Sequence, residues 1–334
     1  MASQRDVKNK IASVKNIQKI TRAMEMVAAA RLRRAEQRIA ALRPYADAIG
    51  RMTRQAAWAA GAEAARVPLL AEHASETNAG LLLVTGDRGL AGGFNSQVVR
   101  AGVRFSAELA EQGLHSSWYA TGRRGVSSLS FRGYELGGEY TGFADRPAYA
   151  DARTIADDLI QAYVDGRLDR VEMVYNSYVS PLTQHVTRQT LLPLTHEAIA
   201  GDQDEDSPAS GHDASLAAGR DASLASGRDA STVADRSNAG GTAAGGLKRT
   251  PVDYEPDPEK ILRRLVPDYI EVSIYRALVE SAAGFFGAQM TAMRSASENA
   301  GEIITEYTLQ MNRARQAEIT QEIMEVVAGA EGLA

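Results

Sequence analysis

The longest helical pattern in this sequence covers residues 268–331, and it limits the possible fold more than any other feature. No proline follows Pro267, and the order Pro267-Asp268 is typical of a helix start. At 1.5 Å per residue, about 60 helical residues form a rod roughly 90 Å long. In its last third, apolar residues recur every three or four positions and predict a narrow contact stripe. They are Ile304, Tyr307, Met311, Ala314, Ile319, Ile323, Val326, Ala330 and Leu333.

A partner of similar length is needed, and the chain has a comparable stretch at its N-terminus. Residues 3–60 are rich in strong helix formers and contain a single proline, Pro44. Their apolar residues recur every three or four positions, and the spacing of Val14, Ile17 and Ile20 predicts a stammer that breaks a strict heptad repeat. Because the two rods lie at opposite ends of the sequence, antiparallel pairing lets both leave one compact base.

The seam between the two rods is expected to contain apolar residues of both. From the stripe at the N-terminus and the stripe at the C-terminus we assign Ile11, Val14, Met24 and Met311 to this seam. The same reasoning expects Ile323 to be buried between the rods.

Strand-like and helical patterns alternate between the rods, which predicts an α/β fold with a mainly parallel sheet. The expected strands are residues 80–85, 116–121, 170–176 and 184–192, with a further apolar segment near 134–140. The expected helices are residues 96–111, 122–131 and 149–164. The predicted fold class is therefore α/β, with a long antiparallel coiled coil of the N- and C-terminal helices and a central Rossmann-like domain. The expected division is residues 1–60, 61–200, 201–250 and 251–334, the last beginning with a turn-rich segment and a short helix at 259–265.

Residues 201–250 interrupt the alternation. They contain three tandem octapeptides that begin at Gly211, Gly219 and Gly227, together with an acidic run and a glycine-rich run. Gly, Ser, Asp and Ala bury too little apolar surface to offset the entropy of ordering, so this segment is predicted to be a disordered insertion.

Charge and composition limit the possible partners. Residues 1–60 contain thirteen Arg and Lys against four Asp and Glu. Such a rod could contact nucleic acid, but its charges are scattered and lack interleaved aromatic residues, so an acidic protein sleeve is the preferred partner and no nucleic acid is expected. No apolar run reaches the length of a membrane span, and the first residues enter the amphipathic stripe directly, so no signal or transit peptide is expected.

Little in the sequence indicates catalysis. The glycine-rich loop at residues 86–95 precedes a helix, where backbone N–H groups can bind phosphate, but its spacing fits neither common nucleotide motif. The chain contains no cysteine, and its five histidines are not at metal-ligand spacing. We therefore expect a non-catalytic protein without a cofactor or metal. A nucleotide-binding protein that uses this loop and a basic coiled-coil scaffold remain as alternatives.

Four segments resemble the gamma subunit of the rotary F-type ATP synthase. They are residues 11–31 (IASVKNIQKITRAMEMVAAAR), 312–330 (NRARQAEITQEIMEVVAGA), 87–95 (DRGLAGGFN) and 254–258 (YEPDP). Ala91 stands where the family often has cysteine, and Phe285 and Phe286 replace a usually polar pair. The resemblance implies a central rotor shaft that couples proton-driven rotation of a membrane c-ring to ATP synthesis or hydrolysis in a surrounding ring.

The resemblance also implies partners and contact residues. The partners are three alpha and three beta subunits around the shaft, an epsilon subunit and the c-ring, at the cytoplasmic face of a bacterial cell membrane, where the complex is peripheral. Arg315 and Gln316, with Arg313 near them, are matched to a polar catch for an acidic loop of a beta subunit. The apolar collar is matched to Ile319, Ile323, Val326 and Val327, and the foot that meets the c-ring and epsilon is matched to Tyr254 and Glu255.

Overall fold

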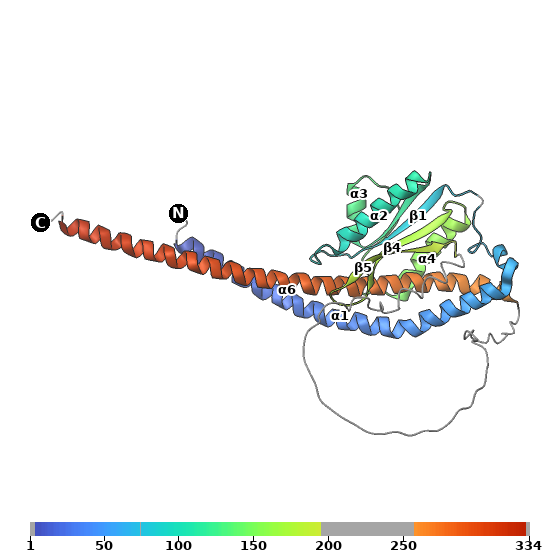
Figure 1. Ribbon diagram of the computed structural model, residues 1–334, viewed down its shortest axis with the longest axis horizontal. Coiled ribbons are helices and arrows are strands. Elements are labelled where there is room, and N and C mark those ends of the chain that lie inside the picture. The colour runs from blue at the N-terminus through green and yellow to red at the C-terminus, as the bar shows by residue number, and fades with distance from the viewer. Residues whose placement is uncertain (1–3, 74, 195–256, 332–334) are drawn as a thin grey trace, which may run out of the picture.

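A computed structural model describes residues 4–73, 75–194 and 257–331 (Figure 1). Two long helices dominate it: α1 (Gln4–Ala60) and α6 (Pro258–Glu331), of 57 and 74 residues. At 1.5 Å per residue α6 is about 110 Å long. Figure 1 shows α1 beside α6, with a small α/β part against one end of the pair and the other end projecting freely.

The two long helices run antiparallel, as their cross-helix contacts show. Lys10 lies over the ring of Tyr307, Gln18 donates to the backbone of residue 297, and Glu25 pairs with Arg294, so position numbers rise along one helix as they fall along the other. Nearer the α/β part, an apolar cluster joins both helices. It includes Leu32, Ala35 and Ile39 of α1 and Val279, Ala283, Phe285 and Phe286 of α6.

The predicted stammer in α1 is wrong. Ile17 and Ile20 are 53% and 59% exposed, and the face that meets α6 instead passes through Gln18 and Thr21. One series of buried and half-buried positions runs in steps of four and three along the helix, as in a heptad repeat, and others such as Met24 and Arg31 flank it. The positions of the series are 7, 11, 14, 18, 21, 25, 28, 32, 35, 39, 42, 46, 49, 53, 56 and 60. Apolar periodicity misplaced the stripe because polar residues occupy the true contact face there.

The predicted helix start at Asp268 is also wrong, because α6 passes through Pro267 without a break. A proline inside a helix removes one backbone hydrogen bond and costs roughly 3 kcal/mol. Its neighbours Leu262, Val266, Tyr269 and Ile270 are all buried in the main core. Burial of this apolar face compensates for the proline, and the expected separate helix at 259–265 becomes the first turns of α6.

The four predicted strands are confirmed, and the apolar segment near 134–140 contains a fifth, in a sheet of order β3-β2-β1-β4-β5. The strands are β1 (Asn78–Val84), β2 (His115–Thr121), β3 (Leu136–Tyr140), β4 (Arg170–Tyr178) and β5 (Gln184–Leu192). The first four are mutually parallel and β5 is antiparallel to β4. The order 3-2-1-4 is that of a doubly wound α/β fold.

The two faces of the sheet have different cores. Helices α2 (Phe94–Glu111) and α3 (Arg123–Phe131) cover the face to which Leu81 and Leu83 point. Helix α4 (Tyr149–Val164) and the long helices cover the opposite face, to which Leu82 and Val84 point. A 3-10 helix, η1 (Gly61–Arg66), follows α1. Because successive strand residues face opposite sides, β1 holds both layers together, and α6 serves as one of them.

A polar junction ties the sheet to both long helices at the end of β4. The Tyr178 hydroxyl donates to Glu36 of α1 at 2.6 Å. The carboxylate of Glu280, buried on α6, accepts the Ser177 hydroxyl at 3.1 Å and pairs with Arg276 at 2.9 Å. The pKa of Tyr178 is raised by burial and by its bond to Glu36. These bonds fix the end of β4 to both long helices, in addition to the apolar packing of the sheet on them.

Candidate partner-binding surface

The end of α6 extends beyond α1 as a single helix (Figure 1). Met311 and Ala314 are the last half-buried residues, and every residue from 315 to 328 is exposed. An exposed apolar stripe on a single helix favours association with another protein in water. Residues 315–328, called here the tip, are therefore the candidate partner-binding surface.

The residues matched to the polar catch lie at the start of the tip and, for Arg313, just before it. Arg313, Arg315 and Gln316 are all exposed. Among the described residues neither arginine makes an ion pair, and the Gln316 backbone carbonyl accepts the Thr320 hydroxyl at 2.8 Å. An unpaired guanidinium offers a planar set of donors that fits a carboxylate. The tip can thus recognise an acidic partner.

The residues matched to the apolar collar form one exposed stripe. Ile319, Ile323, Val326 and Val327 are 44%, 57%, 72% and 47% exposed. The expected burial of Ile323 between the long helices is wrong, because α1, described from Gln4, faces α6 only as far as about Ala314. The apolar spacing is the same in the seam and beyond it, so periodicity alone could not tell where the partner helix ends.

Of the residues assigned to the seam, Ile11 and Val14 belong to the four-and-three series of α1, and Met24 lies beside position 25 of that series. Ile11 is buried, whereas Val14, Met24 and Met311 are half-buried. Tyr254 and Glu255, matched to the foot, lie outside the described residues, as does the insertion at 201–250.

The glycine-rich loop is held closed by its own side chains. The Asn95 amide accepts from Gly86 N at 2.8 Å and donates to the Arg88 carbonyl at 3.1 Å. Asp87 accepts backbone N–H groups of Arg123, at 3.1 Å, and of residues 142 and 144. Its carboxylate therefore occupies the N-terminus of α3, where an anion would otherwise bind. This arrangement disfavours nucleotide binding by the loop.

Sequence reasoning missed a second basic surface, next to the loop. Arg31 and Arg88 both pair with Asp145, at 3.2 and 3.5 Å. Beside them is an open hollow of about 450 Å³. It is lined by Arg31, Arg34, Arg38, Asp145, Arg146 and Phe286. The spacing of residues 31, 34 and 38 could have revealed it, because residues three and four apart share a helix face.

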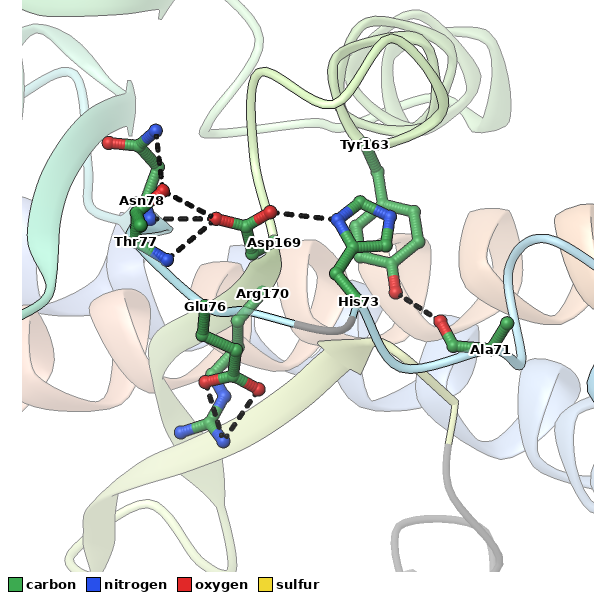
Figure 2. Close-up of polar contacts among 8 residues, drawn as sticks. All are labelled: Ala71, His73, Glu76, Thr77, Asn78, Tyr163, Asp169 and Arg170. Carbon is green, nitrogen blue, oxygen red and sulfur yellow. Dashed lines mark hydrogen bonds and ion pairs between the residues drawn. The ribbon is translucent and has the colours of Figure 1, made fainter.

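Asp169 organises the end of the sheet at which the inner strands β1 and β4 begin (Figure 2). One carboxylate oxygen lies 2.8 Å from His73 Nδ1, and the other accepts the Thr77 N–H and hydroxyl and the Asn78 N–H at 2.8, 3.0 and 2.9 Å. The His73 ring stacks on Tyr163 with centroids 4.5 Å apart. The Thr77 hydroxyl is directed to Asp169 rather than to His73, so the histidine activates no nucleophile here. The network instead fastens the segment before β1 to the start of β4.

Asp169 should make stability depend on pH. Burial raises its pKa, but the bonds from His73, Thr77 and Asn78 outweigh burial and lower the pKa to about 2. An Asp that titrates lower in the folded state stabilises the fold fully above its unfolded pKa, about 4, and loses this contribution as pH falls through about 2. We expect Asp169→Asn to lower the free energy of unfolding by about 2–4 kcal/mol at pH 7 and much less near pH 2.

Thermal unfolding of the isolated chain between pH 7 and 2 measures this effect. The matched control is Asp157→Asn, because the Asp157 side chain is 65% exposed. An equal pH response of the wild type and Asp169→Asn would contradict the assignment.

Over residues 4–73, 75–194 and 257–331, no three His, Asp or Glu side chains gather as a metal site would require. No helix in those same ranges combines the length and apolar character of a membrane span.

Comparison with known proteins supplies the family. The sequence profile described as "ATP synthase" matches residues 3–333. The ATP synthase gamma chain of Rubrobacter xylanophilus is 40% identical over 334 residues, which cover 100% of this chain and 99% of that one. The gamma chain of Synechococcus elongatus is 38% identical over 333 residues, which cover 100% of this chain and 99% of that one.

Solved structures agree on the fold. A chain of the Euglena gracilis mitochondrial ATP synthase, from a structure of OSCP, F1 and the c-ring, has a TM-score of 0.61 at 13% identity, with 99% of this chain and 94% of that chain covered. A chain from the central stalk and c-ring structure of the Tetrahymena thermophila mitochondrial ATP synthase has a TM-score of 0.52 at 22% identity. The match covers 83% of this chain and 99% of that chain. With the sequence matches over the whole length, the chain belongs to the ATP synthase gamma chain family.

Proposed function

We propose that this chain is the central rotor shaft of an F-type ATP synthase. It couples rotation of a membrane c-ring to ATP synthesis or hydrolysis in a ring of three alpha and three beta subunits. The single observation that best supports this is α6, one continuous helix that runs from the α/β base to an unpartnered tip. Relatives that match over their full length are named gamma chains of the same enzyme.

The shaft itself is proposed to be a left-handed antiparallel coiled coil of α1 and α6. Steps of four and three in the buried positions of α1 average 3.5 residues, the period of such a coil. Its mechanical units are residues 1–60, the base at 61–200, the insertion at 201–250 and residues 251–334. Torque passes from the base to both helices through the apolar cluster around Phe286 and through the bond of Tyr178 to Glu36.

The tip is proposed to meet the catalytic ring. Arg315 and Gln316, with Arg313 beside them, bind an acidic loop of a beta subunit. Ile319 and Ile323, with Val326 and Val327, turn in an apolar collar. Tyr254 and Glu255 meet the c-ring and the epsilon subunit at the opposite end.

Catalysis takes place in the ring rather than in this chain. An asymmetric shaft presents a different face to each beta subunit at a given angle, and each face favours a different conformation of the nucleotide site. Differential contact is sufficient for this role, so the shaft needs no cofactor of its own. The complex is placed peripherally at the cytoplasmic face of the bacterial membrane.

Reconstitution tests the proposal. Co-expression with cognate alpha and beta subunits should yield one complex with three copies of each and a single copy of this chain, and ATP turnover that depends on it. Absence of a stoichiometric complex would overturn the proposal. Titration of the isolated chain with ATP tests the nucleotide-binding alternative, and RNA binding with a steep salt dependence would favour the basic scaffold.

A further inference from the structure

A second hollow adjoins the basic one beside the glycine-rich loop. It measures about 330 Å³, and Asp87, Arg88 and Arg123 are among its lining residues. Asp145 and Arg146 line both hollows, so the two form one concave surface, called here the arginine hollow. Six arginines and two aspartates line it. The arginine hollow therefore carries an excess of positive charge.

The two aspartates neutralise only part of this charge. Asp87 accepts three backbone N–H groups with its carboxylate, as described above, and pairs with no guanidinium among the described residues. Asp145 pairs with Arg31 at 3.2 Å and with Arg88 at 3.5 Å through the same oxygen, Oδ2. One carboxylate is thus shared between two guanidinium groups.

Three other arginines of the hollow make no ion pair within the described part of the chain. They are Arg34, Arg38 and Arg146. Arg34 and Arg146 are exposed and Arg38 is half-buried, and Arg38 Nε donates to the Arg34 carbonyl at 3.4 Å. Because Arg34 and Arg38 belong to α1 and Arg146 to the segment between β3 and α4, these charges face the hollow from two elements.

Part of the wall is held in place before any ligand binds. The Arg31 guanidinium lies over the ring of buried Phe286, 5.7 Å from its centroid, and is tied to Asp145. Asp145 in turn holds Arg88 of the loop after β1. A site whose side chains are already ordered loses less conformational entropy on binding.

The shape of the hollow favours a small polyanion over an acidic peptide. The two volumes, about 450 and 330 Å³, lie in the range of small-molecule sites, roughly 300–1,000 Å³. An acidic peptide presents its carboxylates along a line, whereas these guanidinium groups surround a concavity. Linked phosphate groups place several charged oxygens close together, and each guanidinium can bond two of them.

We propose that the arginine hollow binds a small ligand that carries two or more linked phosphate groups. The phosphates contact Arg34, Arg38 and Arg146, and Asp145 keeps Arg31 beside them. Neither the backbone of the glycine-rich loop nor a ring of other subunits takes part. The proposal can therefore fail while the proposed rotor function holds, and the reverse.

Calorimetric titration of the isolated full chain with sodium tripolyphosphate, at about 0.15 M salt and without Mg²⁺, tests the site. We expect one ligand per chain. ATP should bind within about threefold of tripolyphosphate, because the base is not recognised, and AMP at least about tenfold more weakly, because it has a single phosphate. Absence of tripolyphosphate binding, or AMP binding as tight as that of ATP, would overturn the proposal.

Variants locate the binding site. Arg34→Gln with Arg38→Gln should weaken tripolyphosphate binding at least about tenfold. Arg146→Gln changes a different segment and should weaken binding as well, which keeps the test valid if the double variant does not fold. The matched control is Arg33→Gln with Arg43→Gln, which removes the same charge from exposed positions of α1 outside the hollow. It should change the affinity by less than about twofold.

Two further results would contradict the site. Equal weakening by the control pair would mean that the net charge of α1, rather than the hollow, attracts the anion. Tighter binding of a hexaglutamate peptide than of tripolyphosphate would mean that the surface fits an acidic protein segment instead.

Discussion

Replacing Arg315 by alanine should slow ATP turnover of the reconstituted complex by about tenfold or more, while the complex still assembles. Arg315 is exposed at the start of the tip, and among the described residues it makes no ion pair, so its removal costs the fold nothing of note. A guanidinium bonds both oxygens of a carboxylate, and a contact made in only some rotor positions changes the barrier between them. Steady-state hydrolysis by the alpha–beta–gamma complex measures the effect.

Two variants make this result specific. Arg315→Lys should restore only part of the rate, since lysine supplies charge without the planar fork of donors. Arg132→Ala removes an exposed arginine directly after α3, which lies far from the tip, and should leave turnover unchanged. Full turnover by Arg315→Ala would sink the assignment of the catch.

A second pair of variants should distinguish residues that stabilise the contact of α1 and α6 from residues of the exposed tip. Leu32 is 4% exposed and packs in the cluster with Phe286, so Leu32→Asp buries a charge without a partner. We expect it to lower the free energy of unfolding of the isolated chain by more than about 3 kcal/mol. Ile323→Asp, at a side chain 57% exposed, should change it by less than about 0.5 kcal/mol.

In the complex with alpha and beta subunits, Ile323→Asp should have a large effect although it barely changes the stability of the isolated chain. Ile323→Asp places a charge in the proposed apolar collar, so turnover or assembly should fall although the isolated chain is stable. Thermal unfolding and co-purification with alpha and beta subunits measure the two effects. Arg33→Asp is the matched control for Leu32→Asp, because Arg33 is its exposed neighbour. Equal destabilisation by Arg33→Asp would show that charge, not burial, is responsible.

Local signals in the sequence were sufficient for most of the fold. A parallel strand buried on both faces is continuously apolar, so the run Leu81–Val84 between glycines predicted β1. Alternating apolar and polar residues predicted the strand at 184–192 instead. Two very long helical patterns at opposite ends predicted an antiparallel pair. The residues at the tip were found by resemblance to a family, since exposed Arg315 carries no structural signal of its own.

Only the tertiary structure decided which residues of those helices meet. Ile17 and Ile20 are apolar yet exposed, whereas Gln18 and Thr21 face α6. The face of a helix that is buried depends on the supercoil and on the neighbouring helix, and the hydropathy of a single sequence contains neither. For the same reason, the sequence could not show that α1 stops short of Ile323.

What the sequence by itself determined was the set of elements: two rods, most of the strands and helices between them, and their order along the chain, all governed by residues near one another. What the tertiary structure decided were the contacts between distant residues. Asp169 reaches His73 and Thr77 across more than ninety positions, and burial of Leu262 and Ile270 carries α6 through Pro267. Propensity and periodicity act over a few residues, whereas these bonds exist only once the sheet and α6 have brought their partners together.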